Sequence, residues 1–280
     1  MANIEPLSEL AWLAFENAGE LCDPSIGCKD YHRFWSMVRL LDLDGRLPRG
    51  LSFFAKHLAE LKDRNGRLNV VLAGAADTGL AALIAAAAAE SGASASILVV
   101  DRCRTPLLLN RRFAERSGLD IQTRQGTLDD MAADSMDAVI THNVMGFNAE
   151  PDRAAILKSA ARSLRPGGRV LSIEFLSDVR PPRSADETAA LRDGLEAKLR
   201  DTDMAADLVV SLLDAAQAYW STDLTKGPYP EAVFRAHLES APLDLLSLDY
   251  SGDTGRASPR TQPGINKARK HAYIVAERRC

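Results

Sequence analysis

The chain has 280 residues, of which 46% are hydrophobic and 26% charged, a composition typical of a folded globular protein and not of a disordered one. The formal net charge of −4 provides no basic field for a nucleic-acid backbone, so long polynucleotide partners are disfavoured. No apolar run reaches the roughly 20 residues of a membrane span, and the first residues lack the basic start of a signal peptide. We therefore expect a cytoplasmic protein with no membrane partner.

The first 65 residues predict helices. Apolar side chains recur at helical spacing in the stretches 7–14, 31–41 and 53–61. Glycine and proline separate these stretches. We interpret residues 1–65 as an N-terminal helical cap.

From residue 66 onward, short apolar runs alternate with helical patterns. The predicted strands are 68–73, 97–101, 120–124, 137–141 and 169–175, and the predicted helices between them are 80–90, 105–117 and 151–164. Strands that alternate with helices need crossover connections, which produce a parallel sheet covered on both faces. The fold class is therefore α/β, a Rossmann-like open sheet.

The regular alternation stops after residue 175. Ser184 and Glu187 form a capping-box pattern that opens a predicted helix to about residue 200, and a second helix is predicted at 204–219. We interpret about 177–229 as a helical insertion in an α/β domain that spans 66–280. The rest of that domain is predicted as a helix at 230–240, a strand at 243–250, a loop at 251–270 and a strand at 271–278.

The chain contains four cysteines, at positions 22, 28, 103 and 280. Their spacings match no zinc-binding template, and the histidines add no partner at metal-ligand spacing. We interpret the cysteines as reduced thiols and expect no metal.

Four motifs follow one another in a fixed order. The first strand ends in the glycine-containing turn 71–79, and the second strand ends in Asp101. The fourth strand reads from Asp137 to Asn143, and Arg165-Pro166-Gly167-Gly168 precedes the fifth. In this order the motifs resemble those of the class I S-adenosylmethionine-dependent methyltransferases, well over 66–176 and loosely over 230–278. The resemblance implies a mostly parallel sheet with an antiparallel last strand.

Three positions depart from the family pattern. Leu72 stands where an acidic residue usually precedes the first glycine, Ala76 replaces the second glycine, and Thr127 replaces a common aspartate. A non-catalytic member of this fold, acting as a binding or assembly protein, therefore stays an alternative.

The resemblance implies S-adenosylmethionine as cofactor. The turn at Gly74, Ala76 and Gly79 would allow close approach of the backbone, and Asp101 would accept hydrogen bonds from the ribose hydroxyls. Asp77 would meet the ammonium group of the cofactor or cap the following helix. The full set of expected cofactor contacts is Gly74, Ala76, Asp77, Gly79, Asp101, Arg102, Gly126, Thr127, Leu128 and Thr141.

The same glycine turn also fits a dinucleotide fingerprint, so an NAD(P)-dependent oxidoreductase is the main alternative. In that case a diphosphate would bind at the start of the next helix, where the carboxylate of Asp77 would repel it. The sequence also lacks the Tyr-x-x-x-Lys pair that hydride transfer would need. Both observations favour the methyltransferase.

Acceptor-site residues are expected at the carboxyl edge of the sheet and on the helical segments. His142 is the candidate general base, or orients the acceptor, and the alternative is a histidine packed beside the next helix and hydrogen-bonded to the backbone. The candidate acceptor contacts are Tyr31, His32, Trp35, Asn143 and Tyr219, with a core stripe as the alternative for the two aromatic residues of the cap. An enclosed pocket favours methylation of a small metabolite at oxygen or nitrogen. A homodimer is compatible with the sequence.

Overall fold

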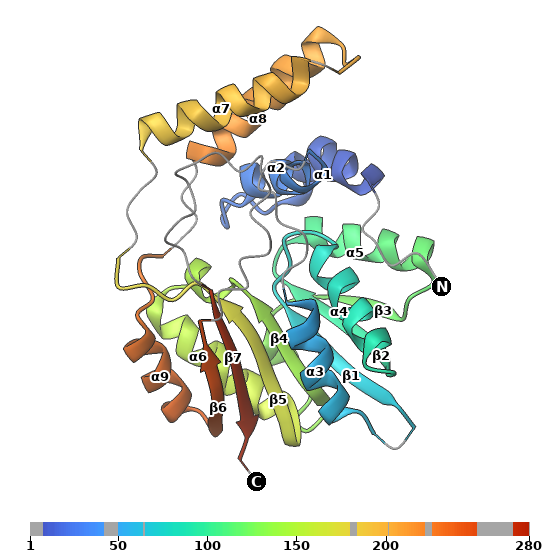
Figure 1. Cartoon of the computed structure of the whole chain (residues 1–280), viewed down its shortest axis with the longest axis vertical. Coiled ribbons are helices and arrows are strands. Elements are labelled where there is room, and N and C mark those ends of the chain that lie inside the picture. Colours follow the sequence, from blue (N-terminus) through green and yellow to red (C-terminus); the bar gives the residue numbers. More distant parts are fainter. Residues whose placement is uncertain are drawn as a thin grey trace.

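The computed structural model describes residues 8–41, 50–63, 65–179, 184–200, 202–221, 226–250 and 271–279. A seven-stranded sheet of order β3-β2-β1-β4-β5-β7-β6 forms its centre (Figure 1). Within this sheet β7 runs antiparallel to both of its neighbours, β5 and β6. The predicted α/β class with an antiparallel last strand is confirmed. The strands are β1 (Arg67–Ala73), β2 (Ser94–Asp101), β3 (Ile121–Gln125), β4 (Met136–His142), β5 (Leu164–Glu174), β6 (Leu243–Asp249) and β7 (Ala272–Arg278).

The fifth strand differs from its prediction at its start. The sequence predicts a turn over 165–168, but β5 already begins at Leu164, which pairs with Met136 of β4. The register then shifts before Ala138 pairs with Arg169, so the predicted turn lies inside the strand as an irregularity. A Cβ atom on Gly168 would lie 2.9 Å from the carbonyl oxygen of Arg165, which explains the glycine there.

Helices cover both faces of the sheet. On one face lie α3 (Leu51–Leu61), α4 (Gly79–Glu90) and α5 (Arg104–Ser117), whose side chains share one core with the inner strands. The other face carries α6 (Glu150–Ser163) and α9 (Glu231–Ser240) around a second core. Five of the seven alanines of α4 are buried, because such small side chains let this helix approach both the sheet and α3 closely.

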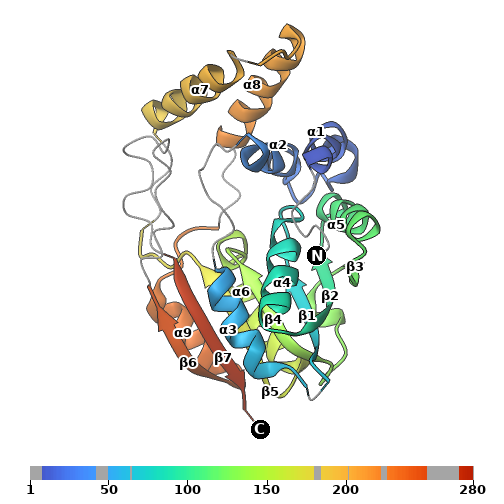
Figure 2. The same ribbon diagram turned by 45° about the vertical axis from the view of Figure 1, so that its right-hand side comes forward.

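Four further helices form a layer beyond the carboxyl ends of the parallel strands (Figures 1 and 2). They are α1 (Ser8–Leu21), α2 (Lys29–Leu40), α7 (Ala185–Arg200) and α8 (Ala206–Ser221), and we call them the helical cap. Their apolar faces share a third core, which joins Phe34 and Met37 of α2 to Leu212 and Trp220 of α8. The cap therefore combines the start of the chain with the predicted insertion, whereas α3 packs on the sheet beside α4.

The two ends of the helical insertion lie side by side. Ser177 and Tyr229, the two ends predicted for it, form an isolated β-bridge. The predicted capping box is confirmed, because the N–H of Glu187 donates to Ser184 Oγ at 3.1 Å and the N–H of Ser184 donates to Glu187 Oε2 at 2.8 Å. The predicted loop 251–270 lies outside the described residues. None of the helices in the described part of the chain is long and apolar enough to cross a lipid bilayer.

Candidate functional site

The turn after β1 is held in place by a glycine. Gly74 has a φ of +80°, and a Cβ atom on it would lie 2.9 Å from Cγ2 of Val144, which follows β4. This position therefore requires glycine both for its backbone conformation and for the close approach of two loops. The next N–H, that of Ala75, donates to Asp101 Oδ2 at 2.9 Å. The turn thus joins the ends of β1, β2 and β4.

Asp101 ends β2 with each carboxylate oxygen accepting one backbone hydrogen bond. Oδ2 accepts from Ala75, and Oδ1 accepts from the N–H of Cys103 at 2.7 Å. Burial raises the pKa of Asp101, and the two N–H donors oppose this shift by favouring the ionised form. Each oxygen of a carboxylate has a second lone pair, so Asp101 can still accept hydrogen bonds from a pair of vicinal hydroxyl groups. The residue fits a ribose.

Asp77 lies at the start of α4 and is buried. Its Oδ1 accepts a hydrogen bond from the N–H of Gly79 at 2.8 Å, so its carboxylate occupies the position that a phosphate takes at a helix N-terminus. Asn110 donates to the carbonyl oxygen of Asp77 at 3.2 Å and fixes the turn from behind. This arrangement agrees with the capping role expected for Asp77 and disfavours a diphosphate here.

The loop after β3 lies against Asp101. The N–H of Gly126 donates to the carbonyl oxygen of Asp101 at 3.0 Å, and a side chain on Gly126, whose φ is +147°, would collide with the Asp130 carboxylate. The N–H of Thr127 donates to that same carboxylate at 2.9 Å. Leu128 turns its side chain into the second core, so of this loop Gly126 and Thr127 stay beside the end of β2.

Arg102 follows Asp101 with an exposed side chain. Its carbonyl oxygen accepts a hydrogen bond from Gln125 Nε2 at 3.1 Å, which links the ends of β2 and β3. The backbone of Arg102 therefore belongs to the same edge of the sheet as the other expected cofactor contacts.

The end of β4 carries His142 and Asn143. Asn143 has a φ of +55°, in the left-handed region that non-glycine residues seldom adopt, and its N–H donates to the carbonyl oxygen of Ile173 at 2.8 Å. Its Nδ2 lies 3.3 Å from Nε2 of His271, a second imidazole that the sequence reading missed. Among the described residues, the buried Oδ1 of Asn143 has no hydrogen-bond partner. A strained residue with an unsatisfied acceptor is typical of a ligand site.

A fully buried carboxyl group, Glu174, organises the loop after β4. It accepts hydrogen bonds from the backbone N–H groups of Val144 at 3.1 Å and Met145 at 3.3 Å, and from the hydroxyl of Thr141 at 3.1 Å. Burial raises the pKa of Glu174 to about 7, although these donors favour its ionised form. Thr141, expected as a cofactor contact, is buried in this network with its Oγ1 2.5 Å from Ser172 Oγ.

Glu174 was not predicted from the sequence. The available signal was a single acidic residue directly after the mostly apolar stretch 170–173, where an unpaired charge would be costly. Such a residue is expected to be hydrogen-bonded or functional.

Three of the expected acceptor contacts come together in one aromatic group. The rings of Tyr31 and Trp35 on α2 stack with centroids 5.4 Å apart, and the Tyr219 ring of α8 lies 5.9 Å from that of Tyr31. Phe147, which follows β4 and was not predicted, lies 5.6 Å from the Tyr31 ring. We call these four residues the aromatic cluster. It joins both halves of the helical cap to the edge of the sheet that carries His142.

His32 lies on the same helix but faces elsewhere. Its buried Nδ1 lies 3.4 Å from Sγ of Cys22 and 3.3 Å from Sγ of Cys103. Cys28 is the fourth member of this group, which we call the Cys3His cluster. The sequence predicted an acceptor contact at His32 and no metal site, because the spacing of the cysteines along the chain does not show that they meet in space.

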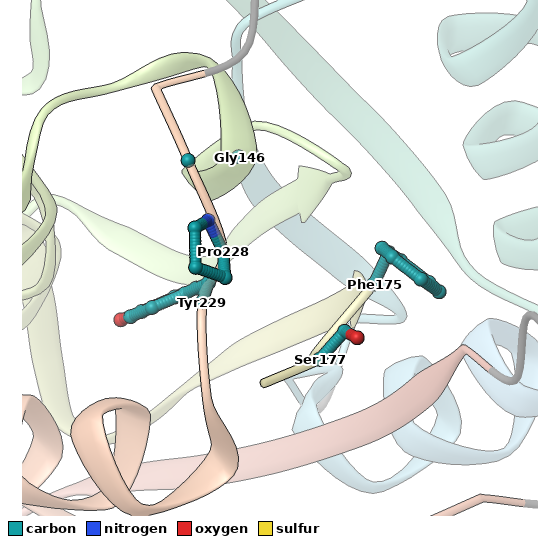
Figure 3. A pocket seen from close by; sticks show the side chains of 6 residues that line it. Gly146, Phe175, Ser177, Pro228 and Tyr229 are labelled. Atoms are coloured by element: carbon teal, nitrogen blue, oxygen red, sulfur yellow. The ribbon is translucent and has the colours of Figure 1, made fainter. Parts of the chain in front are cut away.

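A shallow hollow lies beside the end of β5. It is lined by Gly146, Phe175, Ser177, Gly227, Pro228 and Tyr229, and Figure 3 shows the Tyr229 hydroxyl pointing away from Phe175. It encloses no space that a water molecule could fill, far below the roughly 300–1,000 Å³ of most ligand pockets. The hollow is therefore too small to hold a nucleoside cofactor by itself.

Arg153 of α6 ties together the two segments that border this hollow. Its buried guanidinium donates to the carbonyl oxygens of Met145 at 3.0 Å, Asn148 at 2.8 Å and Pro228 at 2.9 Å. It also lies over the Tyr229 ring, 4.5 Å from the centroid. Arg153 thus fixes the loop after β4 against the return of the insertion.

Residues 53–168, which run from α3 to the irregular start of β5, match the family model of a methyltransferase domain. The match covers less than half of the chain, so the resemblance to a methyltransferase domain holds for this part of the sequence. No curated protein matches the chain.

Solved methyltransferases share the fold at low sequence identity. The mitomycin 7-O-methyltransferase MmcR is 19% identical with a TM-score of 0.50, and the match covers 95% of this chain and 60% of that enzyme. The S-adenosylmethionine-dependent methyltransferase SibL is 15% identical with a TM-score of 0.52, over 95% of this chain and 62% of SibL. A Mesorhizobium loti S-adenosylmethionine-dependent methyltransferase is 16% identical with a TM-score of 0.50, over 82% of this chain and 100% of that protein. The chain thus spans about three fifths of the length of the first two.

The family match implies a cofactor but gives no position for it. S-adenosylmethionine is the methyl donor that a methyltransferase domain of this fold implies. The turn at Gly74, the carboxylate of Asp101 and the loop at Gly126 lie together through direct hydrogen bonds. These residues form a cradle at the ends of β1, β2 and β3, which is the candidate site for the adenosyl group of such a cofactor.

Proposed function

We propose that this methyltransferase methylates an oxygen or nitrogen of a small metabolite that has a planar, apolar part. The observation that carries the proposal is the aromatic cluster. Its rings come from α2, α8 and the segment after β4, and they gather next to the strand ends where open α/β sheets bind ligands. Aromatic rings offer a planar acceptor a large apolar contact and favourable stacking.

The cofactor would be held by Gly74, Asp101, Gly126 and Thr127, with Asp77 and Gly79 at the start of α4. When bound, S-adenosylmethionine supplies a methyl group already activated on its sulfonium. The chain's main tasks are then to orient the acceptor and to exclude water from it. The helical cap, which lies beyond the strand ends, suits both tasks (Figure 2).

His142 would take the proton that the acceptor loses. It ends β4, beside Asn143, which pairs with a second imidazole, that of His271. A histidine suits proton removal near neutral pH because its ordinary pKa is about 6.5. The unpartnered Oδ1 of Asn143 would accept a hydrogen bond from the acceptor and so help to orient it.

Calorimetry and turnover assays test this function. The purified chain should bind S-adenosylmethionine and its demethylated product but not NADH, and should release the demethylated product with an acceptor from a panel of planar phenols and amines. Tyr219→Ala should raise the acceptor KM at least about tenfold and leave the affinity for S-adenosylmethionine unchanged, because in this proposal the ring contacts the acceptor and not the cofactor. Tyr219→Phe keeps the ring and serves as the matched control.

A chain that binds NADH and ignores S-adenosylmethionine would contradict the proposal. If Tyr219→Ala loses cofactor binding and keeps the acceptor KM, the aromatic cluster contacts the cofactor and not the acceptor, which would also contradict the proposal. A homodimer stays a prediction, which sedimentation velocity tests.

A further inference from the structure

The Cys3His cluster lies at the junction between the helical cap and the sheet. Cys22 follows α1, Cys28 precedes α2, His32 lies in the first turn of α2, and Cys103 comes two residues after the end of β2. All four residues are buried, and one ligand atom from each lies within 4.8 Å of the other three. Three sulfur atoms and one imidazole nitrogen therefore surround one point in the interior.

The separations between these atoms match those around a single tetrahedral ion. Zinc binds sulfur at about 2.3 Å and nitrogen at about 2.0–2.1 Å, so in a tetrahedron two sulfur ligands lie about 3.8 Å apart and a sulfur and a nitrogen ligand lie about 3.6 Å apart. Here Sγ of Cys22 and Sγ of Cys103 are 3.5 Å apart, and Nδ1 of His32 lies 3.4 and 3.3 Å from these sulfurs. Each pair is therefore within about 0.3 Å of the tetrahedral separation.

We propose that the Cys3His cluster binds one Zn²⁺ ion as a closed structural site. Three thiolates and one imidazole are a ligand set that zinc prefers, and four protein ligands leave no position open for substrate. Binding releases the thiol protons to solvent and leaves the ion with three sulfur ligands and one neutral nitrogen ligand. The hydroxyl of Thr105, 3.1 Å from Sγ of Cys22, is placed to donate a hydrogen bond to that thiolate.

The same geometry disfavours two other assignments. A disulfide needs its sulfur atoms about 2.05 Å apart, whereas Sγ of Cys22 and Sγ of Cys103 are 3.5 Å apart. A two-iron cluster divides its four ligands between two metal ions and spreads them further than a shared tetrahedron does. One compact tetrahedron suits one ion.

The ion would fix the position of both the expected cofactor site and the aromatic cluster. The backbone N–H of Cys103 donates to Asp101, so this ligand holds the carboxylate expected to bind the ribose. His32 is next in sequence to Tyr31 of the aromatic cluster, so this ligand holds the start of α2 over the edge of the sheet. The metal would thereby connect residues 22–32 to position 103 and set the distance between cofactor and acceptor.

The metal content of the purified chain tests the proposal without any methyl acceptor. Protein prepared without chelators should contain about one zinc per chain by mass spectrometry of its metals. Cys22→Ser, Cys28→Ser, Cys103→Ser and His32→Ala should each lower that content at least about fivefold. Cys280→Ser, at the fourth cysteine of the chain, is the matched control and should keep its zinc.

Two measurements on the unaltered chain keep the test decisive if the variants fail to fold. A mercurial reagent that titrates thiols should release zinc in proportion to the thiols modified, and Co²⁺ in place of zinc should show thiolate-to-metal charge transfer and a tetrahedral visible spectrum. A strong chelator should lower the Tm by at least about 5 °C and weaken binding of S-adenosylmethionine.

Three results would overturn the proposal. They are a folded chain that neither contains zinc nor takes it up at equimolar concentration, a chain that contains iron and inorganic sulfide, and a chain whose Cys22 and Cys103 form a disulfide. The metal content and the Co²⁺ spectrum do not depend on methyl transfer. Failure of the zinc site and failure of the proposed function are therefore distinguishable.

Discussion

Replacing Glu174 by glutamine should change how the stability of the chain depends on pH. Glu174 is fully buried, and its pKa is raised by that burial from 4.5 to about 7. Below pH 4.5 the group is protonated in both the folded and the unfolded chain. Between pH 4.5 and 7 the unfolded chain loses the proton while the folded chain keeps it, so unfolding becomes easier as the pH rises.

The size of the effect follows from the two pKa values. Each factor of ten in proton affinity is worth about 1.4 kcal/mol, so the range from 4.5 to about 7 corresponds to about 3 kcal/mol of stability. That stability is present below pH 4.5 and is lost as the pH rises to 7. Glutamine has no proton to lose, and the N–H of Met145 loses its acceptor if the amide nitrogen faces it, which is a cost independent of pH.

Urea unfolding of both proteins between pH 4.5 and 8 measures the effect. Groups that titrate in both proteins and do not interact with Glu174 cancel in the difference between them. We expect the free energy of unfolding of Glu174→Gln to rise relative to that of the unaltered chain by about 3 kcal/mol across this range. If the difference in unfolding free energy stays constant with pH, or changes in the opposite direction, the inference that Glu174 is a buried, protonated acid is refuted.

Three further substitutions test the site. Gly74→Ala should lower the free energy of unfolding by about 1–2 kcal/mol for its left-handed backbone and by more for the contact with Val144. It should also weaken binding of S-adenosylmethionine in calorimetry. Gly118 has a φ of +69° and open space around it, so Gly118→Ala is the control that should carry the backbone cost alone. Arg153→Ala should destabilise the chain by about 2–4 kcal/mol in urea unfolding. Arg153→Lys should not restore the lost stability, because an ammonium group cannot donate to two segments in the fork geometry of a guanidinium. Full stability of the lysine variant would contradict this role of Arg153. His142→Ala should lower turnover about a hundredfold or more and keep the affinity for S-adenosylmethionine, and unchanged turnover would remove its role as a base.

The fold was predictable because its signals are local. Four of the five parallel strands contain a short apolar run, whereas β3 is mostly polar, and the helices between strands repeat their apolar residues within a few positions. Asp101 and Gly74 were predictable for the same reason, since each stands directly at the end of a predicted strand. The capping box at Ser184 is local as well.

The missed features depend on contacts between distant parts of the chain. Cys103 meets Cys22 and Cys28 only because α1 and α2 return over the end of β2, which no spacing along the chain records. In the sequence, Arg153 looks like a surface arginine of an amphipathic helix, and only the structure shows that the segment around Pro228 covers it. Tyr31, Trp35 and Tyr219 of the aromatic cluster were predicted as separate acceptor contacts. Phe147, and the contacts among the four rings, were not predicted.

The shared core of the helical cap has a consequence for the order in which the chain folds during synthesis. Phe34 of α2 packs against Trp220 of α8, so a ribosome must translate at least 220 residues before α2 gains this contact. Contacts between such distant residues form late because the intervening loop must first be closed. The sheet from β1 to β5 needs only neighbouring segments and can assemble earlier, so the nascent chain acquires its cofactor cradle before the enclosure above it.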